Sequence, residues 1–360
     1  MVDKQRISCG QLICLLTLSR IFYIFTYIPS VNQMLNGSIM LLCLPLSTAL
    51  SFIIIMPSYY FLKKSKGHCL VDGCNAISPA SGKIAAAVLA VYFLFIAAQT
   101  VSQFEYFMTS AVYHGKGTMT FFIILSLVAA YFVYMSIEPI SRAAGIIMFV
   151  VVISLGVMFF TLLGHVNLVN VISPFYEGVK EVVKVSVFAA FRNTELVALL
   201  MMLPYTNGNF KKIFVGYQLW ALMLLELITF FTLTVLGNFA RTTNYPVYSL
   251  STITGFSFLQ GLDAIYNCIW VFIALIRTAF YLFLTVRCIG LFCDNRFKKS
   301  YLPISTFVLL IIGCILSNNT ELFVASYKLI SNGFIIASVV FIIPIVLLGV
   351  LLIRPWREQR

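Results

Sequence analysis

Apolar residues occur along the chain in runs of about twenty, separated by short polar stretches that hold most of the Lys and Arg residues. A membrane-spanning helix needs about 20 predominantly apolar residues, so each run predicts one span. The ten runs cover residues 7–29, 38–61, 84–113, 118–137, 143–163, 183–204, 213–239, 263–292, 302–316 and 333–353. The pattern therefore predicts an all-α polytopic membrane protein with ten transmembrane helices.

The composition agrees with a protein that lies almost entirely within the bilayer. Hydrophobic residues make up 61% of the 360 positions and charged residues only 10%, whereas a soluble protein carries about a quarter charged residues. No polar stretch is long enough for a soluble domain, so residues 1–360 are interpreted as a single transmembrane domain. The first apolar run lacks a small-residue cleavage site, and we expect it to be a retained span rather than a signal peptide.

The net charge of +12 is spread over short connections and predicts topology rather than nucleic-acid binding. The two termini and the even-numbered connections carry fifteen Lys and Arg residues, and the odd-numbered connections carry five. In membrane proteins the cytoplasmic loops carry the excess of Lys and Arg. We therefore expect both termini to be cytoplasmic.

The sixth apolar run is interrupted at its centre by polar residues. Arg192, Asn193, Thr194 and Glu195 follow Phe191 at mid-depth, where each charge costs a few kcal/mol. This pattern predicts a helix that is broken in the middle of the membrane and lines a polar cavity. The alternative is a continuous helix in which Arg192 and Glu195 pair with each other or extend to the interface.

Ten spans divide into two halves of five, which we interpret as repeats at about 7–163 and 181–353. An odd number of spans in each half inverts the second half relative to the first, so spans 1 and 6 are equivalent. Span 1 is interrupted by Ser19 and Arg20. Broken helices at equivalent positions of inverted halves indicate a ligand site near the midplane of the bilayer. The alternative is that the match in position is coincidental.

Several connections carry structural signals of their own. Glu138-Pro139 is expected to break the chain ahead of span 5. The connection 240–262 looks like an interfacial loop with short helical pieces. Cys69 and Cys74 share the polar loop after span 2 without a convincing zinc spacing, and we interpret them as free thiols on the reducing side.

Glu195 is the first candidate for a functional residue. It either anchors the broken helix, binds ligand or titrates, or it pairs permanently with Arg192 or Arg277. Arg277 lies deep in span 8 and needs a carboxylate or carbonyl partner, so we favour a structural or gating ion pair over ligand contact. Arg20 could bind a carboxylate, or it could hold its helix to the neighbouring helices.

Polar and aromatic residues of spans 1, 3, 6 and 8 are predicted to surround the ligand. The candidate ligand-binding residues are Ser19, Phe22, Tyr23, Gln99, Gln103, Phe191, Asn193, Thr194, Glu195 and Trp270, and the candidate gating or ion-pair residues are Arg20, Arg192 and Arg277. Asn193 and Thr194 are also expected to cap the second half of the broken helix. Glu105 and Glu226 are lone membrane carboxylates and rank below Glu195.

Enzymatic chemistry has little support in the sequence. The three His residues, at 68, 114 and 165, are far apart in loops, and neither a G-x-S-x-G nor an H-E-x-x-H motif occurs. We predict no metal site and no cofactor. The chain is therefore interpreted as a non-enzymatic membrane protein.

Several short motifs follow one another along nearly the whole chain. They are Ile7-Ser8, Gln11, Leu12, Ser19-Arg20 and Pro29, the segment 136–142, the segment 167–178, Glu195 and Pro204, Tyr245-Pro246, the segment 258–263, and Trp270. In order and spacing they resemble the spore germination permease family, the B-type integral membrane subunits of nutrient germinant receptors.

The resemblance implies the amino acid–polyamine–organocation superfamily and a LeuT-like fold, which agrees with the inverted-repeat interpretation. It also implies that the chain senses a small nutrient, often an amino acid, beside a larger A-type subunit and a lipoprotein C-type subunit. Phe22 stands where the family usually has glycine, and Arg192 and Asn193 replace small residues. Gly261 stands where arginine is common, and Arg277 where lysine is common. The bulky Phe22 and Arg192 are expected to shrink or reshape the pocket, which leaves open whether the usual ligand fits.

Three functional hypotheses follow. In the first, a small amphiphile enters a cavity between spans 1, 3, 6 and 8 from the outer face, stabilises one arrangement of the bundle and so signals to partner subunits. In the second, the chain is a secondary transporter of amino acids driven by a proton or ion gradient. In the third, it is a scaffold subunit without a ligand. Uptake of labelled amino acid by the chain alone would distinguish the transporter from the sensor.

Overall fold

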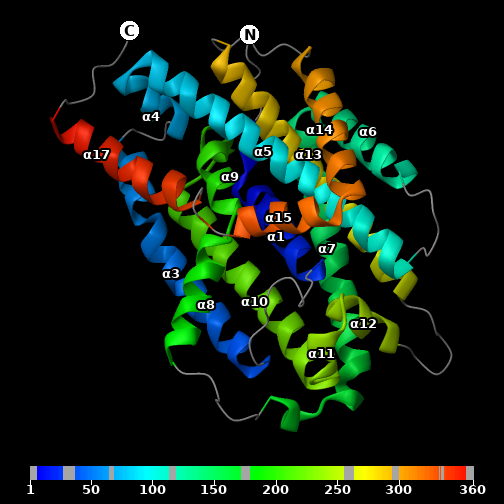
Figure 1. The fold of residues 1–360 in the computed structure, drawn as a ribbon. Coiled ribbons are helices and arrows are strands. Elements are labelled where there is room, and N and C mark those ends of the chain that lie inside the picture. Colours follow the sequence, from blue (N-terminus) through cyan, green and yellow to red (C-terminus); the bar gives the residue numbers. More distant parts are fainter. Residues whose placement is uncertain are drawn as a thin grey trace.

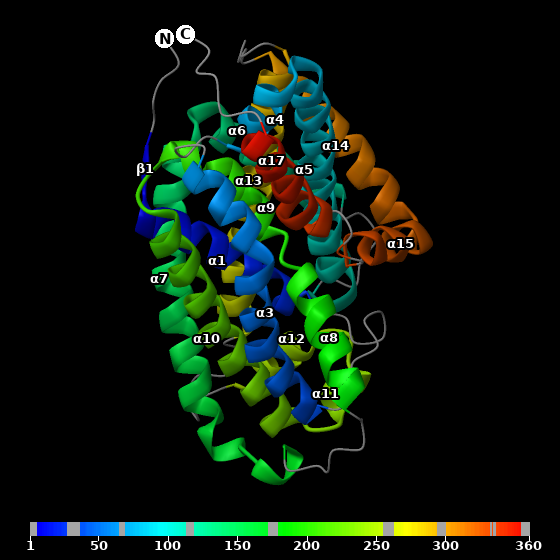
Figure 2. The ribbon, with the colours of Figure 1, turned by 90° about the vertical axis from the view of Figure 1, so that its left-hand side faces the viewer.

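A computed structural model describes residues 6–26, 37–64, 69–112, 119–171, 179–254, 263–293, 300–331, 333 and 336–353, and nearly all of them are helical. Some positions of the predicted motifs lie outside the described residues, namely Pro29, Pro174 and positions 258–262. Figures 1 and 2 show a bundle of helices in which α1, in dark blue, crosses the interior. The main helices, in chain order, are α1 (Cys9–Phe25), α3 (Gly37–Lys64), α4 (Leu70–Ile77), α5 (Pro79–Phe107), α6 (Met119–Met135), α7 (Ile137–Leu162), α8 (Val179–Phe191), α9 (Glu195–Met202), α10 (Phe210–Leu236), α11 (Phe239–Thr242), α12 (Pro246–Ile253), α13 (Asp263–Phe292), α14 (Tyr301–Asn318), α15 (Thr320–Ser331) and α17 (Ile343–Ile353).

Short elements fill the remaining described segments. They are the strands β1 (Ile7–Ser8) and β2 (Thr206–Asn207), the π-helical turns Met108–Val112 and Ala337–Ile342, and the 3-10 turns Leu163–His165, Leu168–Asn170 and Leu203–Tyr205.

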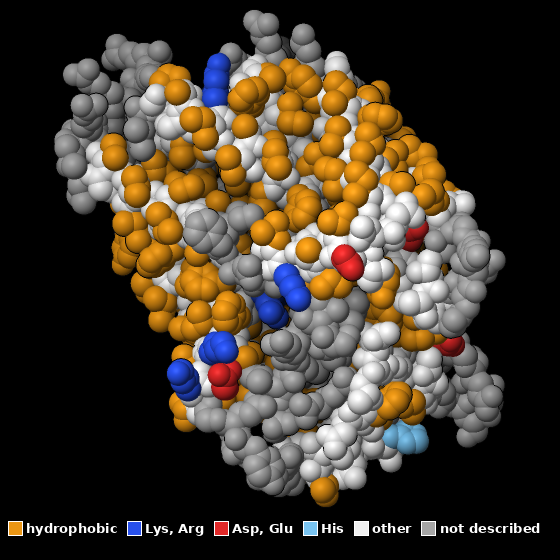
Figure 3. All heavy atoms as spheres, in the orientation of Figure 1, with side chains coloured by type: hydrophobic (Ala, Val, Ile, Leu, Met, Phe, Trp, Pro, Cys, Tyr) orange, Lys and Arg blue, Asp and Glu red, His pale blue; other side chains and the backbone are white. Residues whose placement is uncertain are grey.

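The helices confirm an all-α polytopic membrane fold. Seven helical stretches in the described part of the chain are long and apolar enough to cross a membrane: Ile39–Phe61, Pro79–Val112, Ile137–His165, Val179–Tyr205, Phe210–Leu236, Asp263–Phe292 and Tyr301–Asn318. Three shorter apolar helices, Cys9–Phe25, Met119–Met135 and Ala337–Val350, coincide with the other predicted spans. Hydrophobic side chains also gather over the upper part of the face seen in Figure 3, as expected of a protein in lipid.

The first predicted span is not interrupted at Ser19 and Arg20, contrary to expectation. Helix α1 continues through both residues and ends at Phe25. It begins with a capping box, in which the Ser8 side chain accepts from the Gln11 main-chain nitrogen and the Gln11 side chain accepts from the Ser8 nitrogen. Ser19 and Arg20 therefore do not interrupt their own helix, and their side chains form hydrogen bonds to other elements.

The sixth predicted span is broken where the sequence places its polar residues. Helix α8 ends at Phe191 and α9 begins at Glu195, with a tight turn over Arg192, Asn193 and Thr194 between them. Asn and Thr compete with the main chain for hydrogen bonds and are poor residues for a helix interior. The alternative of a continuous sixth helix is therefore wrong.

A two-stranded parallel sheet joins the first span to the end of the sixth. Ile7 pairs with Thr206, and Ser8 pairs with Asn207. Because β1 leads directly into α1 and β2 follows α9, the sheet fixes α1 beside the broken helix. Helix α13, the most buried of the long apolar helices, packs on α1, α5, α6 and α7 and completes the core.

Three connections differ from the sequence expectation. The chain breaks at Ser136, whose φ is 100°, and α7 begins one residue later, so Pro139 lies in the first turn of the helix rather than at the break. Cys69 and Cys74 are free thiols, as predicted, but they belong to the short helix α4 and its start instead of a polar loop. Helix α15 occupies part of the predicted connection between the last two spans.

The 240–262 connection agrees with the expectation, because its helical pieces are α11 and α12.

Candidate functional site

Arg20 of α1 binds the carbonyl oxygens at the break of the sixth span. Arg20 Nη1 donates to the main-chain oxygen of Arg192 at 3.0 Å, and Arg20 Nη2 donates to that of Ala189 at 3.5 Å. The last carbonyl oxygens of a helix have no partner within the helix and carry partial negative charge. The Arg20 side chain, only 14% exposed, supplies both the hydrogen bonds and the positive charge that this end of α8 requires.

Glu195, the first residue of α9, is completely buried in a hydrogen-bond network. Its Oε1 accepts from Arg277 Nη1 at 2.8 Å, from Ser19 Oγ at 2.9 Å and from Tyr281 Oη at 3.4 Å. Its Oε2 lies 4.0 Å from Arg20 Nη1 and has no hydrogen-bond partner among the described residues. The carboxylate also stands at the positive end of α9, where negative charge is stabilised.

Arg277 is paired with Glu195, as favoured from the sequence, and its Nη1 and Nε make further hydrogen bonds. Nη1 binds the main-chain oxygen and the Oγ of Ser19, and Nε donates to Thr100 Oγ1 at 3.1 Å. The guanidinium carbon lies 4.2 Å from the centre of the Tyr23 ring and 5.0 Å from that of Tyr281. Arg277 thus joins α13 to α1, α5 and α9 through one buried charge.

The two polar residues of the turn bind tyrosines rather than capping α9. Tyr217 Oη donates to Asn193 Oδ1 at 2.5 Å, and the hydroxyls of Thr194 and Tyr281 are 3.1 Å apart. Thr194 makes no side-chain capping bond, so the predicted capping role is wrong. Tyr217 of α10 and Tyr281 of α13 bind the Asn193 and Thr194 side chains because they lie in the same buried layer.

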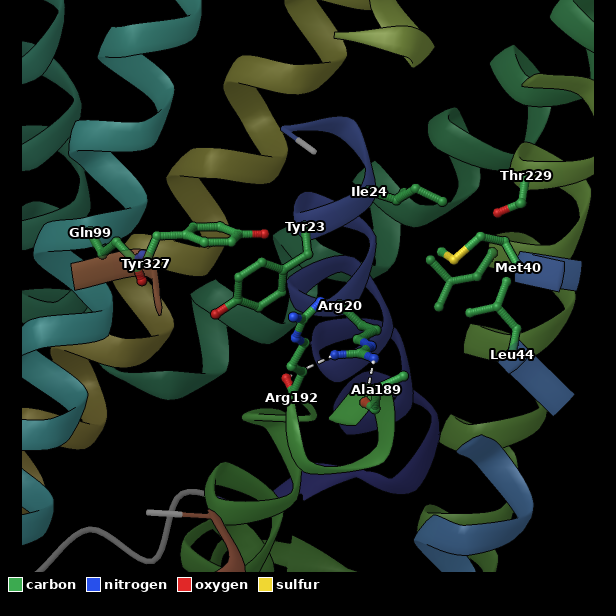
Figure 4. A pocket seen from close by; sticks show the side chains of 11 residues that line it. Arg20, Tyr23, Ile24, Met40, Leu44, Gln99, Ala189, Arg192, Thr229 and Tyr327 are labelled. Atoms are coloured by element: carbon green, nitrogen blue, oxygen red, sulfur yellow. Dashed lines mark hydrogen bonds between the residues drawn. The ribbon is translucent and has the colours of Figure 1, made fainter. Parts of the chain in front are cut away.

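A cavity of about 120 Å³ lies beside the broken helix. Its lining comes from six helices and consists of Arg20, Tyr23 and Ile24 of α1, Met40 and Leu44 of α3, Gln99 of α5, Ala189 and Arg192 at the end of α8, Leu225 and Thr229 of α10, and Tyr327 of α15. Figure 4 shows Arg20 and Arg192 near Tyr23 at the middle of the view, with Gln99 and Tyr327 on one side and Met40, Leu44 and Thr229 on the other. A volume below the 300–1,000 Å³ of drug-sized pockets limits the occupant to a small molecule.

The cavity contains four of the predicted site residues, and the others lie elsewhere. Arg20, Tyr23, Gln99 and Arg192 line it. The buried network around Glu195 takes up Ser19, Phe22, Asn193, Thr194, Glu195 and Arg277, with the Arg277 guanidinium 5.5 Å from the Phe22 ring centre. Tyr23 touches Arg277 and also lines the cavity, so it connects the network with the cavity.

Three further predicted residues lie outside both groups. Gln103 Nε2 donates to the main-chain oxygen of Thr26 at 3.1 Å. Trp270 packs in an aromatic cluster, with its ring 3.6 Å from that of Phe107, centre to centre. Phe191 contacts the close-packed Gly333.

The two lone carboxylates are also absent from the cavity lining. Glu105 lies at a separate apolar groove between α5, α6 and α14, together with Phe122 and Cys314. Glu226 is on α10, the helix that supplies Leu225 and Thr229 to the cavity.

Sequence reasoning missed several residues that complete the site. Tyr281 is four positions after Arg277 and therefore shares its helix face, a signal that was present in the sequence. Tyr217 and Tyr327 carried no such signal, because α10 reads as an ordinary span and α15 was not predicted. Among the described residues, no group of three or more His, Cys, Asp or Glu residues is placed to hold a metal ion.

Comparison with known proteins gives one family. The model of the family described as spore germination protein matches residues 39–322 of this chain. No curated protein matches this chain.

Proposed function

Since the chain belongs to the spore germination protein family, we propose that it is the membrane-embedded germinant-sensing subunit of a spore nutrient receptor. In this proposal it binds a small nutrient, such as an amino acid, near the middle of the membrane and signals to partner subunits. The chain is a multi-pass, permease-like membrane protein related to germination, as its family and its apolar helices indicate. The ligand site, the signal and the partners are the proposed part.

The observation that carries this proposal is the small cavity beside the break between α8 and α9. Irregular backbone inside a membrane is tolerated where it is buried in protein or lines a cavity, and transporter folds place ligands at such breaks. Here the residues at the break, Arg20 and Arg192, are also part of the cavity lining. A ligand in the cavity therefore touches the groups that hold the two half-helices in place.

The proposed mechanism is a shift between two arrangements of the bundle. A ligand favours the arrangement to which it binds more tightly, by as much as its difference in affinity for the two. Tyr23 and Arg20 link the cavity to the Arg277–Glu195 pair, and so to α13 and α9. We propose that ligand binding repositions α8 against α1 and that this movement is transmitted to A-type and C-type partner subunits.

A cavity-filling substitution tests the function. Ala189→Phe places a large ring on a cavity-lining position of α8, and Val183→Phe places the same ring on an exposed position of the same helix. In a spore-forming host that depends on this chain, we expect Ala189→Phe to abolish the germination response to a panel of amino acids and Val183→Phe to preserve it. Subunit abundance in spore membranes is measured for both variants. A normal response by an abundant Ala189→Phe protein contradicts the proposal.

Proteoliposomes carrying this chain alone separate the sensor from a secondary transporter. The sensor requires no net uptake of labelled amino acid and a germination response only when the partner subunits are present. Gradient-driven uptake by the chain alone contradicts a purely sensory role. A ligand-free scaffold would leave germination unaffected by every substitution in the cavity.

The finer architecture belongs to the same proposal. We propose a LeuT-like arrangement of two inverted five-helix repeats, at about 7–163 and 181–353, with both termini cytoplasmic. The break of the sixth helix and the match between the apolar helices and the predicted spans support it. Reporter fusions at each terminus and at the connection after α8–α9 give the orientation, and a terminus outside the cytoplasm would overturn it.

A further inference from the structure

The positive charges at the break exceed the negative charges that compensate them. Arg277 is matched by Glu195, and Arg20 is used by the carbonyl oxygens at the end of α8. Arg192 forms no ion pair within the described part of the chain, and its buried Nε has no hydrogen-bond partner there. A partly buried guanidinium inside the bundle is costly without compensation, so a negatively charged partner is expected for it.

The cavity supplies the space for that partner. Arg192 and Arg20 line it, and Gln99, which is 2% exposed, presents a buried amide nitrogen without a hydrogen-bond partner. These groups donate hydrogen bonds, and a carboxylate accepts them from guanidinium groups in a favourable geometry.

The same cavity offers an ammonium group hydroxyl and amide acceptors, at Tyr23, Thr229, Tyr327 and Gln99, but no opposite charge among the described residues. Among the described residues, its lining includes no Asp or Glu side chain. Glu195 is completely buried and outside the lining, with its Oε1 shared by Arg277, Ser19 and Tyr281. The rest of the lining is largely apolar, with Ile24, Met40 and Leu44 among its members. This surface suits a short hydrocarbon tail.

We propose that the ligand of this cavity is a small apolar carboxylate, bound through its carboxylate to Arg192, and that an α-amino group weakens binding. The inference rests on the proposed function and specifies its ligand class. It follows from the excess of positive over negative charge in the described lining, because an ammonium group there loses its hydration and meets two guanidinium groups without a carboxylate. Arg192 is the specificity-determining residue.

Three compounds that differ only in their charged groups test the inference. They are 3-methylbutanoate, L-valine, which adds the amino group, and 2-methylpropylamine, which is valine without its carboxylate. Binding to the purified full-length chain in nanodiscs at pH 7 is measured by calorimetry. We expect 3-methylbutanoate to bind at least about tenfold more tightly than L-valine, and 2-methylpropylamine and inorganic phosphate not to bind. Equal or tighter binding of L-valine, the amine or phosphate overturns the inference, as does the absence of carboxylate binding.

Variants connect the selectivity to Arg192. Arg192→Gln is expected to weaken 3-methylbutanoate binding at least about tenfold, and Arg192→Lys to recover part of it because the charge is retained. Lys184→Gln is the matched control, since it removes an exposed positive charge from the same helix, and it should leave binding unchanged. Unchanged binding in a folded Arg192→Gln protein contradicts the assignment.

Germination assays with the same compounds distinguish this inference from the proposed function. If 3-methylbutanoate binds selectively but has no effect on germination, the ligand class stands and the sensory function fails. If L-valine binds more tightly and triggers germination through this chain, the function stands and the ligand class is wrong.

Discussion

The Arg20 guanidinium on α1 binds the main-chain oxygen of Arg192 at 3.0 Å, although the two residues are 172 positions apart. This contact explains why α1 is continuous while the sixth span is broken. A buried arginine needs acceptors, and a broken helix exposes carbonyl oxygens that need donors. The Arg20 side chain and the carbonyl oxygens at the end of α8 therefore satisfy each other.

Removing this contact should destabilise the protein. Arg20→Gln loses the charged donor at the end of α8, and a hydrogen bond to a charged group is worth about 2 kcal/mol. We expect a lower melting temperature in detergent, followed by tryptophan fluorescence. Arg142→Gln is the control, because that side chain is 68% exposed and its ion-pair partner in the described part of the chain is Glu138. Equal melting temperatures for the two variants would show that the Arg20 contact carries no stability.

The Arg277–Glu195 pair should show strong coupling between its members. Removing one partner leaves a buried unpaired charge, which costs about 3–5 kcal/mol, whereas replacing both with uncharged residues is close to neutral. Glu195→Gln and Arg277→Met should each lower stability more than the double variant does. The measurement is a double-mutant cycle by thermal unfolding. Additive effects of the two substitutions would contradict the pairing.

Gly333 should not tolerate a side chain. Its φ of 67° favours glycine, and a Cβ atom there would collide with Phe191 at the end of α8. Gly333→Ala is expected to destabilise the protein by at least about 1 kcal/mol.

Gly145 provides the opposite case. A Cβ at this position in α7 has no neighbour within 4 Å. Because alanine is the better helix former, Gly145→Ala should stabilise the protein slightly. Thermal unfolding compares the two variants, and a neutral Gly333→Ala would contradict the close approach of its backbone to Phe191.

The thiol of Cys74 should react slowly at neutral pH. Burial raises the pKa of Cys74 from 9.0 to about 11, and only the thiolate is nucleophilic. Below this pKa the thiolate fraction rises tenfold for each pH unit, so alkylation should accelerate about tenfold between pH 8 and pH 9. Iodoacetamide labelling followed by mass spectrometry of the Cys74 peptide gives the rate. A rate that levels off between pH 9 and pH 10 would show an ordinary thiol.

Apolar run length was sufficient to locate the seven long apolar helices of the described chain but not the short helix α15. The described helix α13 has the predicted bounds, 263–292, because a long apolar run flanked by polar residues marks a span by its length alone. Helix α15 was missed because its twelve residues mix Glu321 and Lys328 with apolar positions. Such a segment becomes a helix through packing rather than hydrophobicity, and its Tyr327 forms part of the cavity lining.

The sequence by itself determined that the chain lies in a membrane, and it located the break of the sixth helix. Both follow from the cost of polar groups in lipid, which depends on residue type and depth and can be calculated position by position. Only the tertiary structure decided which charge meets which partner. In the folded protein Glu195 pairs with Arg277, Arg20 binds the end of α8, and Arg192 lines the cavity. A buried charge accepts any partner of suitable chemistry within a few ångströms, and the packing of helices that are distant in sequence selects among them.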